Sequence, residues 1–374
     1  MIFSINKEVF LNNLTVAQKA VSSKTPNPAL QGINIEAKED SIVIITSNSD
    51  ISIKLEIKDQ SLQIEKTGTS LIPGKFFIDI IRKLDAETIS LSMVEDNMLR
   101  IFANRSDITL NTMDIADYPH IPFQLKENPI LLDAKILKSI IKQTTFATST
   151  VENRPILTGV NLKVREDKLY AISTDSFRLS QKKVDITSDF NNLNIIIPGR
   201  SLDELLKVIE NENSQVELHL DNNKILFKFS NVLFQSRLLE GNYPETSRLI
   251  PVDFPIVLKF KKDDLISRVE RAALLSTKEG NNSIVKLTLK TNSTVEISSN
   301  YPEIGKIVEE IFPLENVTGA AIKIAFSSKY FLDALKTFAS ENVSVKFTGE
   351  IRPFIIEGEI DPGLIELILP VRTE

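Results

Sequence analysis

The sequence has no cysteine, no tryptophan, two histidines and five tyrosines among its 374 residues. Without cysteine there can be no disulfide framework and no thiolate nucleophile, which fits a reducing cytoplasm. His120 and His219 are far apart in the chain, so a zinc site with histidine ligands or a Ser-His-Asp arrangement has few candidates. The scarcity of Trp and Tyr disfavours stacking on single-stranded nucleic acid.

Long apolar runs are also absent. No stretch reaches the roughly 18 apolar residues of a membrane-spanning helix, and the first residues, MIFSINKEVF, do not form a signal peptide. We therefore expect a soluble, cytosolic protein that makes no membrane contact. The net charge is −6, which by itself disfavours a nucleic-acid partner because phosphate-binding domains are usually basic.

What the sequence does contain is an internal repeat. Residues 71–84 (LIPGKFFIDIIRKL) return 125 positions later as residues 196–209 (IIPGRSLDELLKVI), and more weakly as residues 325–338 (AFSSKYFLDALKTF). A single core seldom grows past roughly 250 to 300 residues, so two or three domains are expected in a chain of this length. The repeat predicts three tandem domains, at residues 1–126, 127–252 and 253–374.

Each copy has the same order of predicted elements. The first begins with an amphipathic helix that carries Val9, Phe10, Leu14 and Ala17, and continues with short alternating strands such as residues 32–38 (GINIEAK). A second helix and a second set of strands complete the copy. The predicted fold class is therefore α+β, in three tandem copies of a domain that packs helices on an antiparallel sheet.

Charge is divided unevenly between the predicted helices and the rest of the chain. We expect helices at residues 7–20, 75–84, 134–146, 200–208, 263–275 and 328–338, where 14 Lys or Arg stand against 8 Asp or Glu. The helices thus carry +6 and the remainder −12. A single lysine usually indicates only a solvated helix face. Basic faces in all three copies instead predict a surface that attracts a polyanion by counterion release, without reading its sequence.

Signs of catalysis are weak. Residues 68–76 (GTSLIPGKF) superficially resemble a phosphate-binding loop, but the glycines are too far apart and Phe76 replaces the Ser or Thr that would hold magnesium. We interpret the segment as a strand end and a helix start. The pair Asp263-Asp264 falls at a predicted helix start, and Asp114 and Asp117 fall in a loop, where capping or solvation accounts for them. We expect no catalytic site, no metal and no cofactor.

The order of several motifs resembles one family. These motifs are the Ile-Pro-Gly-Arg helix entry at residues 197–200, residues 153–161 (NRPILTGVN), 173–179 (STDSFRL) and 241–251 (GNYPETSRLIP), and the end at residues 369–372 (LPVR). With the triplicated domain, they resemble the beta subunit of bacterial DNA polymerase III along essentially the whole chain. The resemblance implies a non-catalytic sliding clamp, in which two chains joined head to tail close a six-domain ring around duplex DNA.

The resemblance also implies a partner-binding pocket between the second and third domains and the C-terminus. Its predicted residues are Leu157, Thr174, Ser176, Phe177, Arg178, Leu179, Pro244, Arg248, Leu249, Pro353, Leu367, Leu369, Pro370, Val371 and Arg372. Its apolar side chains would bind Leu and Phe anchors of a short peptide, while Arg178 and Arg248 would bind polar groups. In the competing interpretation, Leu157, Leu179 and Leu367 belong to the core and Arg178 is a surface ion-pair partner.

Two pocket positions depart from the family. Phe177 stands where the family commonly has histidine, and Pro353 where some members have a small polar residue. Thr373 and Glu374 extend past the usual end of the chain and could partly cover the pocket. The sequence therefore predicts the pocket but not its preferred peptide.

The resemblance assigns further residues to DNA and to the ring interface. The predicted DNA contacts are Lys24, Lys75, Arg82, Asn153, Arg154 and Arg200. In the ring, Ile108 and Leu110 of one chain would pack against Leu274 and Leu275 of another, although packing within one domain is a competing account. The expected partners are duplex DNA, a second copy of the chain, the replicative polymerase, a clamp loader that uses ATP, and other polymerases and repair proteins with Leu/Phe peptides.

Two other function classes stay open. A monomeric module for polyanions would bind linear and circular DNA alike, with an affinity that falls steeply in salt. A scaffold for protein interactions would not depend on DNA. The order of motifs favours the ring over both, and the expected place of action is the nucleoid in the cytoplasm.

Overall fold

The structure of the chain is a computed structural model that describes residues 1–22, 25–95, 97–186, 193–209, 213–276, 278–279, 282–290, 294–315, 317 and 319–372. These residues form two compact units. Unit 1 comprises Met1–Lys138 and Ser201–Leu238, and unit 2 comprises Ser139–Arg200 and Leu239–Glu374. Each unit therefore combines segments of neighbouring predicted repeats. No helix within the described ranges is long and apolar enough to cross a membrane.

Unit 1 is built on antiparallel strands. Its described residues form a five-stranded sheet in the order β5-β1-β7-β8-β9 and an eight-stranded sheet in the order β10-β15-β16-β17-β4-β3-β2-β6. The first sheet contains β1 (Ile2–Asn6), β5 (Gln63–Lys66), β7 (Thr88–Glu95), β8 (Met98–Ala103) and β9 (Ser106–Asn111). The second contains β2 (Gly32–Ala37), β3 (Ile42–Ser47), β4 (Ile51–Ile57), β6 (Gly68–Pro73), β10 (Ile130–Asp133), β15 (Gln215–Asp221), β16 (Lys224–Phe229) and β17 (Val232–Arg237).

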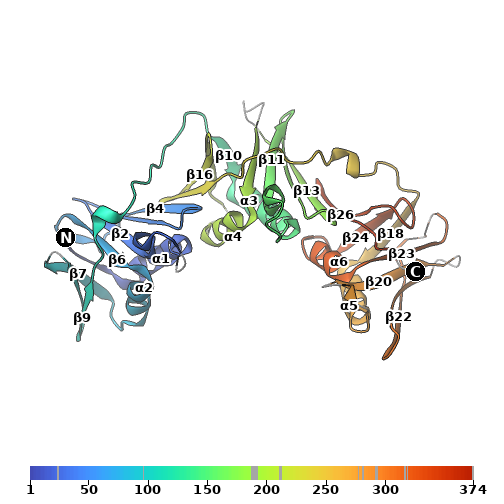
Figure 1. The fold of residues 1–374 in the computed structure, drawn as a ribbon, viewed down its shortest axis with the longest axis horizontal. Helices are drawn as coiled ribbons and strands as arrows, with labels where there is room; N and C mark the ends of the chain where they lie inside the picture. Colours follow the sequence, from blue (N-terminus) through green and yellow to red (C-terminus); the bar gives the residue numbers. More distant parts are fainter. Residues whose placement is uncertain are drawn as a thin grey trace. The chain divides into compact units, whose positions relative to one another are not determined.

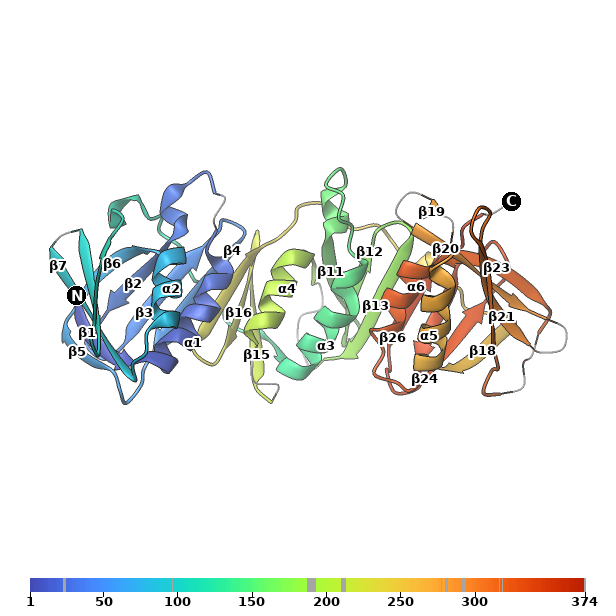
Figure 2. The ribbon, with the colours of Figure 1, turned by 90° about the horizontal axis from the view of Figure 1, so that it is seen from below.

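Helices α1 (Lys7–Ala17) and α2 (Gly74–Lys83) lie side by side in unit 1, as Figure 1 and Figure 2 both show. The buried side of α2 carries Phe77, Ile78 and Ile81. This spacing gives the helix a single apolar face, which packs inward and leaves the opposite face to solvent.

The Pro-Gly pair of the repeat has a steric cause. A Cβ atom at Gly74 would lie 3.0 Å from the Gln31 carbonyl oxygen, and one at Gly199 would lie 3.0 Å from Thr148 Oγ1. Contacts this short leave little room for a side chain, so glycine suits both helix entries. The interpretation of residues 68–76 as strand end and helix start is confirmed, because β6 ends at Pro73 and α2 follows at once.

Unit 2 repeats the antiparallel plan. Its described residues form an eight-stranded sheet in the order β14-β11-β12-β13-β26-β25-β24-β18 and a five-stranded sheet in which β19-β20-β21-β22 are neighbours and β23 pairs with β20. The larger sheet contains β11 (Gly159–Arg165), β12 (Lys168–Thr174), β13 (Arg178–Asp185), β14 (Asn194–Pro198), β18 (Ile256–Lys261), β24 (Asn342–Phe347), β25 (Phe354–Gly358) and β26 (Leu364–Ile368). The smaller contains β19 (Lys278–Glu279), β20 (Asn282–Leu289), β21 (Val295–Tyr301), β22 (Gly305–Ile311) and β23 (Ile322–Ser327).

The helices of unit 2 include the pair α5 (Lys262–Ala273) and α6 (Ser328–Leu335), which lie side by side (Figure 2). Helices α3 (Ala134–Thr144) and α4 (Gly199–Val208) each have residues in both units. Short 3₁₀ turns are η1 (Gln18–Ala20), η2 (Pro28–Gln31), η3 (Ile115–Asp117), η4 (Thr145–Ala147), η5 (Pro155–Thr158) and η6 (Ser247–Leu249).

The two eight-stranded sheets cross the predicted domain seams. In unit 1, β4 of the first repeat pairs with β17 of the second, and in unit 2, β13 of the second repeat pairs with β26 of the third. Main-chain hydrogen bonds therefore join each repeat to the next. The α+β class with helices on antiparallel sheets is confirmed, whereas the seams at residues 126 and 252 remain predictions.

Candidate functional site

The predicted pocket residues near the C-terminus meet the second repeat along one strand pair. β13 and β26 are antiparallel, with Leu179 opposite Leu367. Just past the end of β26, the Leu369 N–H donates to the Phe177 carbonyl oxygen at 2.9 Å. The backbone thus brings these four predicted residues to one place in unit 2.

Arg178, at the start of β13, is buried and held from several directions. Its Nε donates to Asp175 Oδ2 at 3.1 Å, its Nη1 to Asp333 Oδ2 at 2.8 Å and its Nη2 to the Phe146 carbonyl oxygen at 2.6 Å. The guanidinium carbon lies 5.0 Å from the centre of the Phe146 ring and 4.6 Å from that of Tyr330. Three of its five N–H groups are therefore used inside the protein. Arg178 is an ion-pair partner, but a buried one rather than the surface one of the competing interpretation.

The turn before β13 has a fixed geometry. Asp175 Oδ1 accepts from the Phe177 N–H at 2.9 Å, and Thr174 Oγ1 accepts from the Ser176 N–H at 3.1 Å. Ser176 adopts a φ of +80°. This turn presents the Phe177 ring, which is 59% exposed and stacks on Tyr330 with ring centroids 6.4 Å apart. Phe177 therefore belongs to the surface of the site, where a bound partner can reach it.

The connector after β17 contributes the next group of predicted residues. The Tyr243 hydroxyl accepts from the Thr174 N–H at 3.0 Å, and burial raises the pKa of Tyr243. The neighbouring Pro244 is exposed, as are Arg248 and Leu249 in η6. Tyr243 thus ties the connector to the turn; it stood inside the quoted 241–251 motif, but the sequence predicted no role for it.

The remaining predicted pocket residues divide by burial. Leu157, Leu179 and Leu367 are at most 4% exposed, so their side chains pack in the interior, as the competing interpretation expects. Pro353, Pro370 and Val371 are half-buried, and Leu369 and Arg372 are exposed. Thr373 and Glu374 lie outside the described residues. Within the described part of the chain, no side-chain hydrogen bond or ion pair joins Arg248 or Arg372 to the β13–β26 pair.

The predicted DNA contacts of unit 1 lie on α2 or beyond the described ranges. Lys75 and Arg82 are exposed on α2. Arg82 forms an ion pair with Asp79 at 2.8 Å, whereas Lys75 has no ion-pair partner among the described residues. Lys24 lies outside the described residues.

The predicted DNA contacts of unit 2 are exposed. Asn153 and Arg154 lie in the loop before η5, and Arg200 lies in the first turn of α4. Arg154 Nη1 donates to Ser176 Oγ at 3.4 Å. A predicted DNA contact is therefore next to the turn of the predicted peptide pocket.

Some basic side chains of the helices are already in ion pairs and are not free to bind a polyanion. On α5, Arg268 forms an ion pair with Asp264 at 2.9 Å, and Arg271 forms one with Glu309 of β22 at 2.7 Å. The Arg271 guanidinium lowers the pKa of Glu309 by its hydrogen bond, against the opposing effect of burial. Arg268 and Arg271, two of the 14 cations counted on the predicted helices, are thus already paired within the protein.

The predicted ring-interface residues lie at two sheet edges or beside them. Ile108 and Leu110 are half-buried on β9, which is an edge strand among the described residues. Leu274, just after α5, is 78% exposed, and Leu275 is half-buried. Packing within one domain therefore does not cover Leu274.

Comparison with known families covers the chain from end to end. Models of the DNA polymerase III beta subunit match in order: the N-terminal domain at residues 1–122, the central domain at 131–245 and the C-terminal domain at 247–372. The chain belongs to the DNA polymerase III beta subunit family. This membership confirms the prediction of three tandem clamp domains and of a sliding clamp that is an accessory subunit rather than an enzyme.

Individual beta-subunit relatives agree with the family match. Proteins named beta sliding clamp from Staphylococcus epidermidis and Staphylococcus aureus are 40% and 39% identical over 378 residues, covering 100% of both chains. The solved structure of the DNA polymerase sliding clamp from Bacillus subtilis is 40% identical, with a TM-score of 0.94 and 100% of both chains covered. That of the DNA polymerase III beta chain from Streptococcus pneumoniae is 39% identical, with a TM-score of 0.95 and the same coverage.

This beta-subunit chain has a buried acid behind the predicted pocket that the sequence did not reveal. Glu366 on β26 is 1% exposed, and its Oε1 lies 3.0 Å from Ser180 Oγ and 3.2 Å from Thr337 Oγ1. Burial raises the pKa of Glu366 well above its ordinary value, although these hydroxyls and Arg178 act in the opposite direction. Burial therefore favours the protonated form of Glu366 over the charged carboxylate.

Other contributors to the site were also missed. Phe146, Tyr330 and Asp333 surround Arg178 but come from distant parts of the sequence. The only signal for two of them was their spacing of three on the predicted helix at residues 328–338, which puts Tyr330 and Asp333 on one face. Asp175 stood inside the quoted 173–179 motif, but its role as an acceptor for Arg178 depends on the turn.

Proposed function

We propose that two copies of this chain close a ring around duplex DNA and that the site beside β26 binds peptides of its partners. The main support for the ring is a strand pairing between neighbouring repeats, which occurs twice in the chain. We call each of these pairings a joint. β4 pairs with β17 in unit 1, and β13 pairs with β26 in unit 2. Each joint links a strand of one repeat to a strand of the next.

Two further strands, β9 and β22, occupy the same positions in their repeats as the strands that form the joints. β4, β13 and β22 begin at Ile51, Arg178 and Gly305, so successive starts are 127 residues apart. β9 begins at Ser106, 126 residues before Val232 at the start of β17. Both β9 and β22 are edge strands among the described residues, and such edges accept strands from other chains. Pairing β22 of each copy with β9 of the other repeats the joint and closes a head-to-tail ring.

The register of the known joint supports the predicted interface residues. In unit 1, Ser236 lies opposite Ile51. The same register would place Leu110 of one copy opposite Gly305 of the other. A Cβ atom at Gly305 would lie 3.9 Å from Leu275 Cδ1, so Leu110 would approach Leu275. Ile108 and Leu274 would flank this contact.

The ring is tested by placing a charge in the proposed joint. Ile108→Asp would bury a carboxylate without a partner, so we expect monomers in sedimentation or light scattering. Thr109→Asp is the matched control, because Thr109 is exposed and its side chain points to the other face of β9. A dimer that survives Ile108→Asp with unchanged affinity would show that the joint is elsewhere.

The DNA contacts that we propose are Lys24, Lys75, Arg82, Asn153, Arg154 and Arg200. Exposure of the five described residues supports them. Contacts of this kind to phosphates carry no sequence information, and each one lost should reduce the slope of log affinity against log salt by about 1. Topology rather than affinity would hold the ring on DNA.

Partners would be tethered through the pocket. A polymerase or repair protein that inserts Leu and Phe side chains beside Leu369 and Val371 stays near the DNA at high effective concentration, which makes synthesis processive. The ring would be opened by a clamp loader that uses ATP; in this chain, residues 68–76, which resemble a phosphate loop, form a strand end and a helix start instead. A ring held by topology is retained on circular DNA and runs off linear DNA, whereas binding by surface charge alone would hold both equally.

A further inference from the structure

Two cavities occupy the same place in successive repeats. In unit 1, a cavity of about 530 Å³ lies between strands β2, β3 and β4 and the connector at residues 115–124. In unit 2, a cavity of about 300 Å³ lies between β11, β12 and β13 and the connector at residues 243–252. Each connector carries the repeated Tyr-Pro pair, at residues 118–119 and 243–244, and the pair lines the cavity.

One row of residues in the sheet wall corresponds between the two cavities. In unit 1, Asn34 lies opposite Ile45, and Ile45 lies opposite Lys54, so the three form a row across adjacent strands. The row recurs in unit 2, 127 positions later, as Asn161, Ile172 and Gln181. A lysine in the first row thus stands where the second row has a neutral amide.

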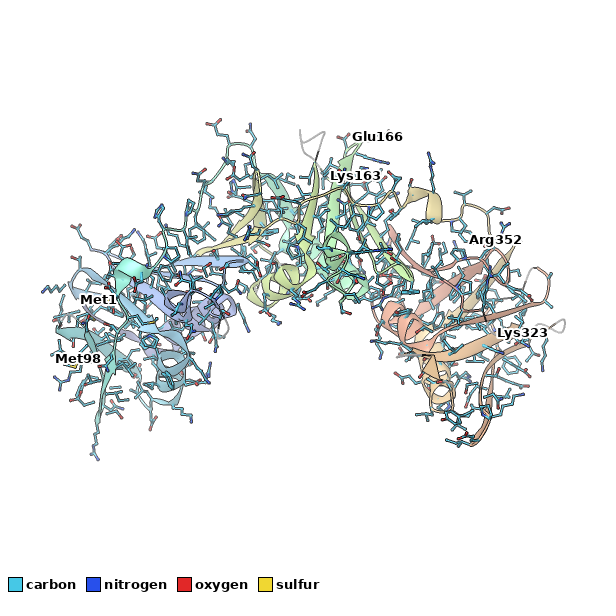
Figure 3. The ribbon with its side chains drawn as sticks, in the orientation of Figure 1. Met1, Met98, Lys163, Glu166, Lys323 and Arg352 are labelled. Carbon is cyan, nitrogen blue, oxygen red and sulfur yellow. The ribbon has the colours of Figure 1, made fainter. Side chains whose placement is uncertain are left out.

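Several polar groups of the unit 2 cavity pair with one another. Asn161 Nδ2 donates to Asn194 Oδ1 at 2.8 Å. Glu245 of the connector forms ion pairs with two cations of β11: its Oε2 lies 3.4 Å from Arg165 Nη2 and 3.8 Å from Lys163 Nζ. Lys163 is labelled in Figure 3. The connector of unit 2 therefore supplies its own carboxylate to the cations of the sheet.

The polar groups of the unit 1 cavity are not satisfied in this way. Asn34 Oδ1 is buried and has no hydrogen-bond partner in the structure. Lys54 is half-buried, and it has no ion pair within the described residues. A buried acceptor and a half-buried ammonium without partners cost free energy, which a ligand with a donor and an anionic group recovers. The connector wall is already in place, because the Tyr118 hydroxyl donates to the Ile45 carbonyl oxygen at 3.2 Å.

We propose that the unit 1 cavity is a second docking site, for an acidic peptide of a partner protein. A side-chain carboxylate of the peptide binds Lys54 Nζ, a backbone N–H donates to Asn34 Oδ1, and a neighbouring apolar side chain packs against Ile115 and Ile121. A peptide fits because it supplies all three groups within a few atoms, and the volume is that of an ordinary ligand site. This site goes beyond the proposed function and is independent of the pocket beside β26.

The test uses a short probe and isoleucine methyl NMR of the full-length protein. The probe is acetyl-Leu-Asp-Leu-amide, and acetyl-Leu-Asn-Leu-amide is its uncharged match. We expect saturable shifts of the Ile45, Ile115 and Ile121 methyl signals with the Asp peptide. Affinity for the Asn peptide should be about tenfold lower, the effect of losing one charge-assisted hydrogen bond.

Variants of the protein complete the test. Lys54→Gln copies the residue of the second repeat, so the fold should be kept while affinity for the Asp peptide falls about tenfold. Lys58→Gln is the control, because Lys58 is exposed, pairs with Asp40 and lies outside the cavity lining; it should leave affinity unchanged. Equal affinity for both peptides, or an unaffected Lys54→Gln variant, would overturn the proposal. So would shifts confined to Ile172 and Ile365 of unit 2, or the absence of saturable shifts.

Discussion

The two joints between repeats have the same antiparallel backbone pairing but differ in the chemistry of their side chains. In the unit 1 joint, Ile53 lies opposite Phe234, and both are fully buried. The corresponding pair in the unit 2 joint is Ser180 opposite Glu366, which is also buried. The same strand pairing is therefore compatible with an apolar core and with a buried polar network.

The contrast extends along the two strands. Ile51 and Leu55 of β4 are replaced at the equivalent positions of β13 by Arg178 and Lys182. Lys182 is 8% exposed and donates to the Pro362 carbonyl oxygen at 3.0 Å, and burial lowers its pKa. Buried ionic groups contribute less net stability than apolar packing, but they need their partners in fixed positions. The joint beside the proposed peptide pocket is thus the one with directional interactions.

The largest expected effect concerns peptide binding at the end of β26. Replacing Leu369, Pro370 and Val371 by alanine should weaken a Leu/Phe-bearing peptide by roughly 4 to 6 kcal/mol, since two or more anchoring contacts are lost. Fluorescence polarisation with the full-length protein measures the loss. The control is Leu238→Ala, which changes a residue just after β17 in the unit 1 joint and should leave the affinity for the peptide unchanged. Unchanged binding by the triple variant would refute the pocket assignment.

Removing Arg178 should have the next largest effect. Arg178→Ala removes the guanidinium that bonds Asp175 Oδ2, Asp333 Oδ2 and the Phe146 carbonyl oxygen, so the free energy of unfolding should fall by about 3 to 5 kcal/mol. Denaturant unfolding measures the change. Arg165→Ala is a control, because Arg165 is exposed in its pair with Glu245, and its loss should cost under about 1 kcal/mol. Similar small losses for both variants would mean that the polar joint is not a tightly coupled network.

The pH dependence of stability should distinguish the two joints. Because the folded-state pKa of Glu366 is raised, its contribution is present at low pH and is lost as pH rises from the ordinary glutamate range through the raised value. Glu366→Gln removes this loss, so its stability relative to the parent should increase by up to about 1.4 kcal/mol per pH unit in that window. Unfolding curves collected from acidic to alkaline pH provide the comparison. Parallel pH profiles would contradict a buried, titrating Glu366.

The smallest effect on the free energy of unfolding is expected at Phe177, which stands where the family commonly has histidine. Phe177→Ala removes the stack on Tyr330 and should lower the free energy of unfolding by about 0.5 to 1.5 kcal/mol. Phe177→His, which restores the common family residue, should lose less than Phe177→Ala. Thermal unfolding resolves the difference, and a stabilised Phe177→Ala variant would show that the ring is present for binding rather than for packing.

The periodic parts of the fold were accessible from the sequence. The helix predicted at residues 7–20 is α1 followed by η1, and the one predicted at residues 200–208 is α4 with one more residue at its start. Local apolar spacing and the Pro-Gly entry were sufficient for these. Asp114 does cap η3, since its Oδ1 accepts from the Ala116 N–H at 2.9 Å.

The joints were not accessible, because alternation along a strand does not reveal which strand lies beside it. β4 and β17 are far apart in the sequence, and nothing local connects them. The polar joint was missed for a second reason: Glu366 is charged, and such residues are expected at the surface unless a partner is known. The repeat offsets identify β4, β13 and β22 as counterparts, since β13 and β22 follow β4 at equal spacing, but they do not reveal which strand pairs with each.

The most direct test of the ring is retention on DNA of different topology. The protein is loaded with its cognate loader on a nicked circular plasmid, separated from free protein by gel filtration, and separated again after the plasmid is cut once. A ring predicts protein that co-migrates with the circle and runs off the linear DNA, even at salt concentrations that abolish binding by surface charge. Equal retention on circular and linear DNA would contradict topological encirclement and would favour a surface DNA-binding module.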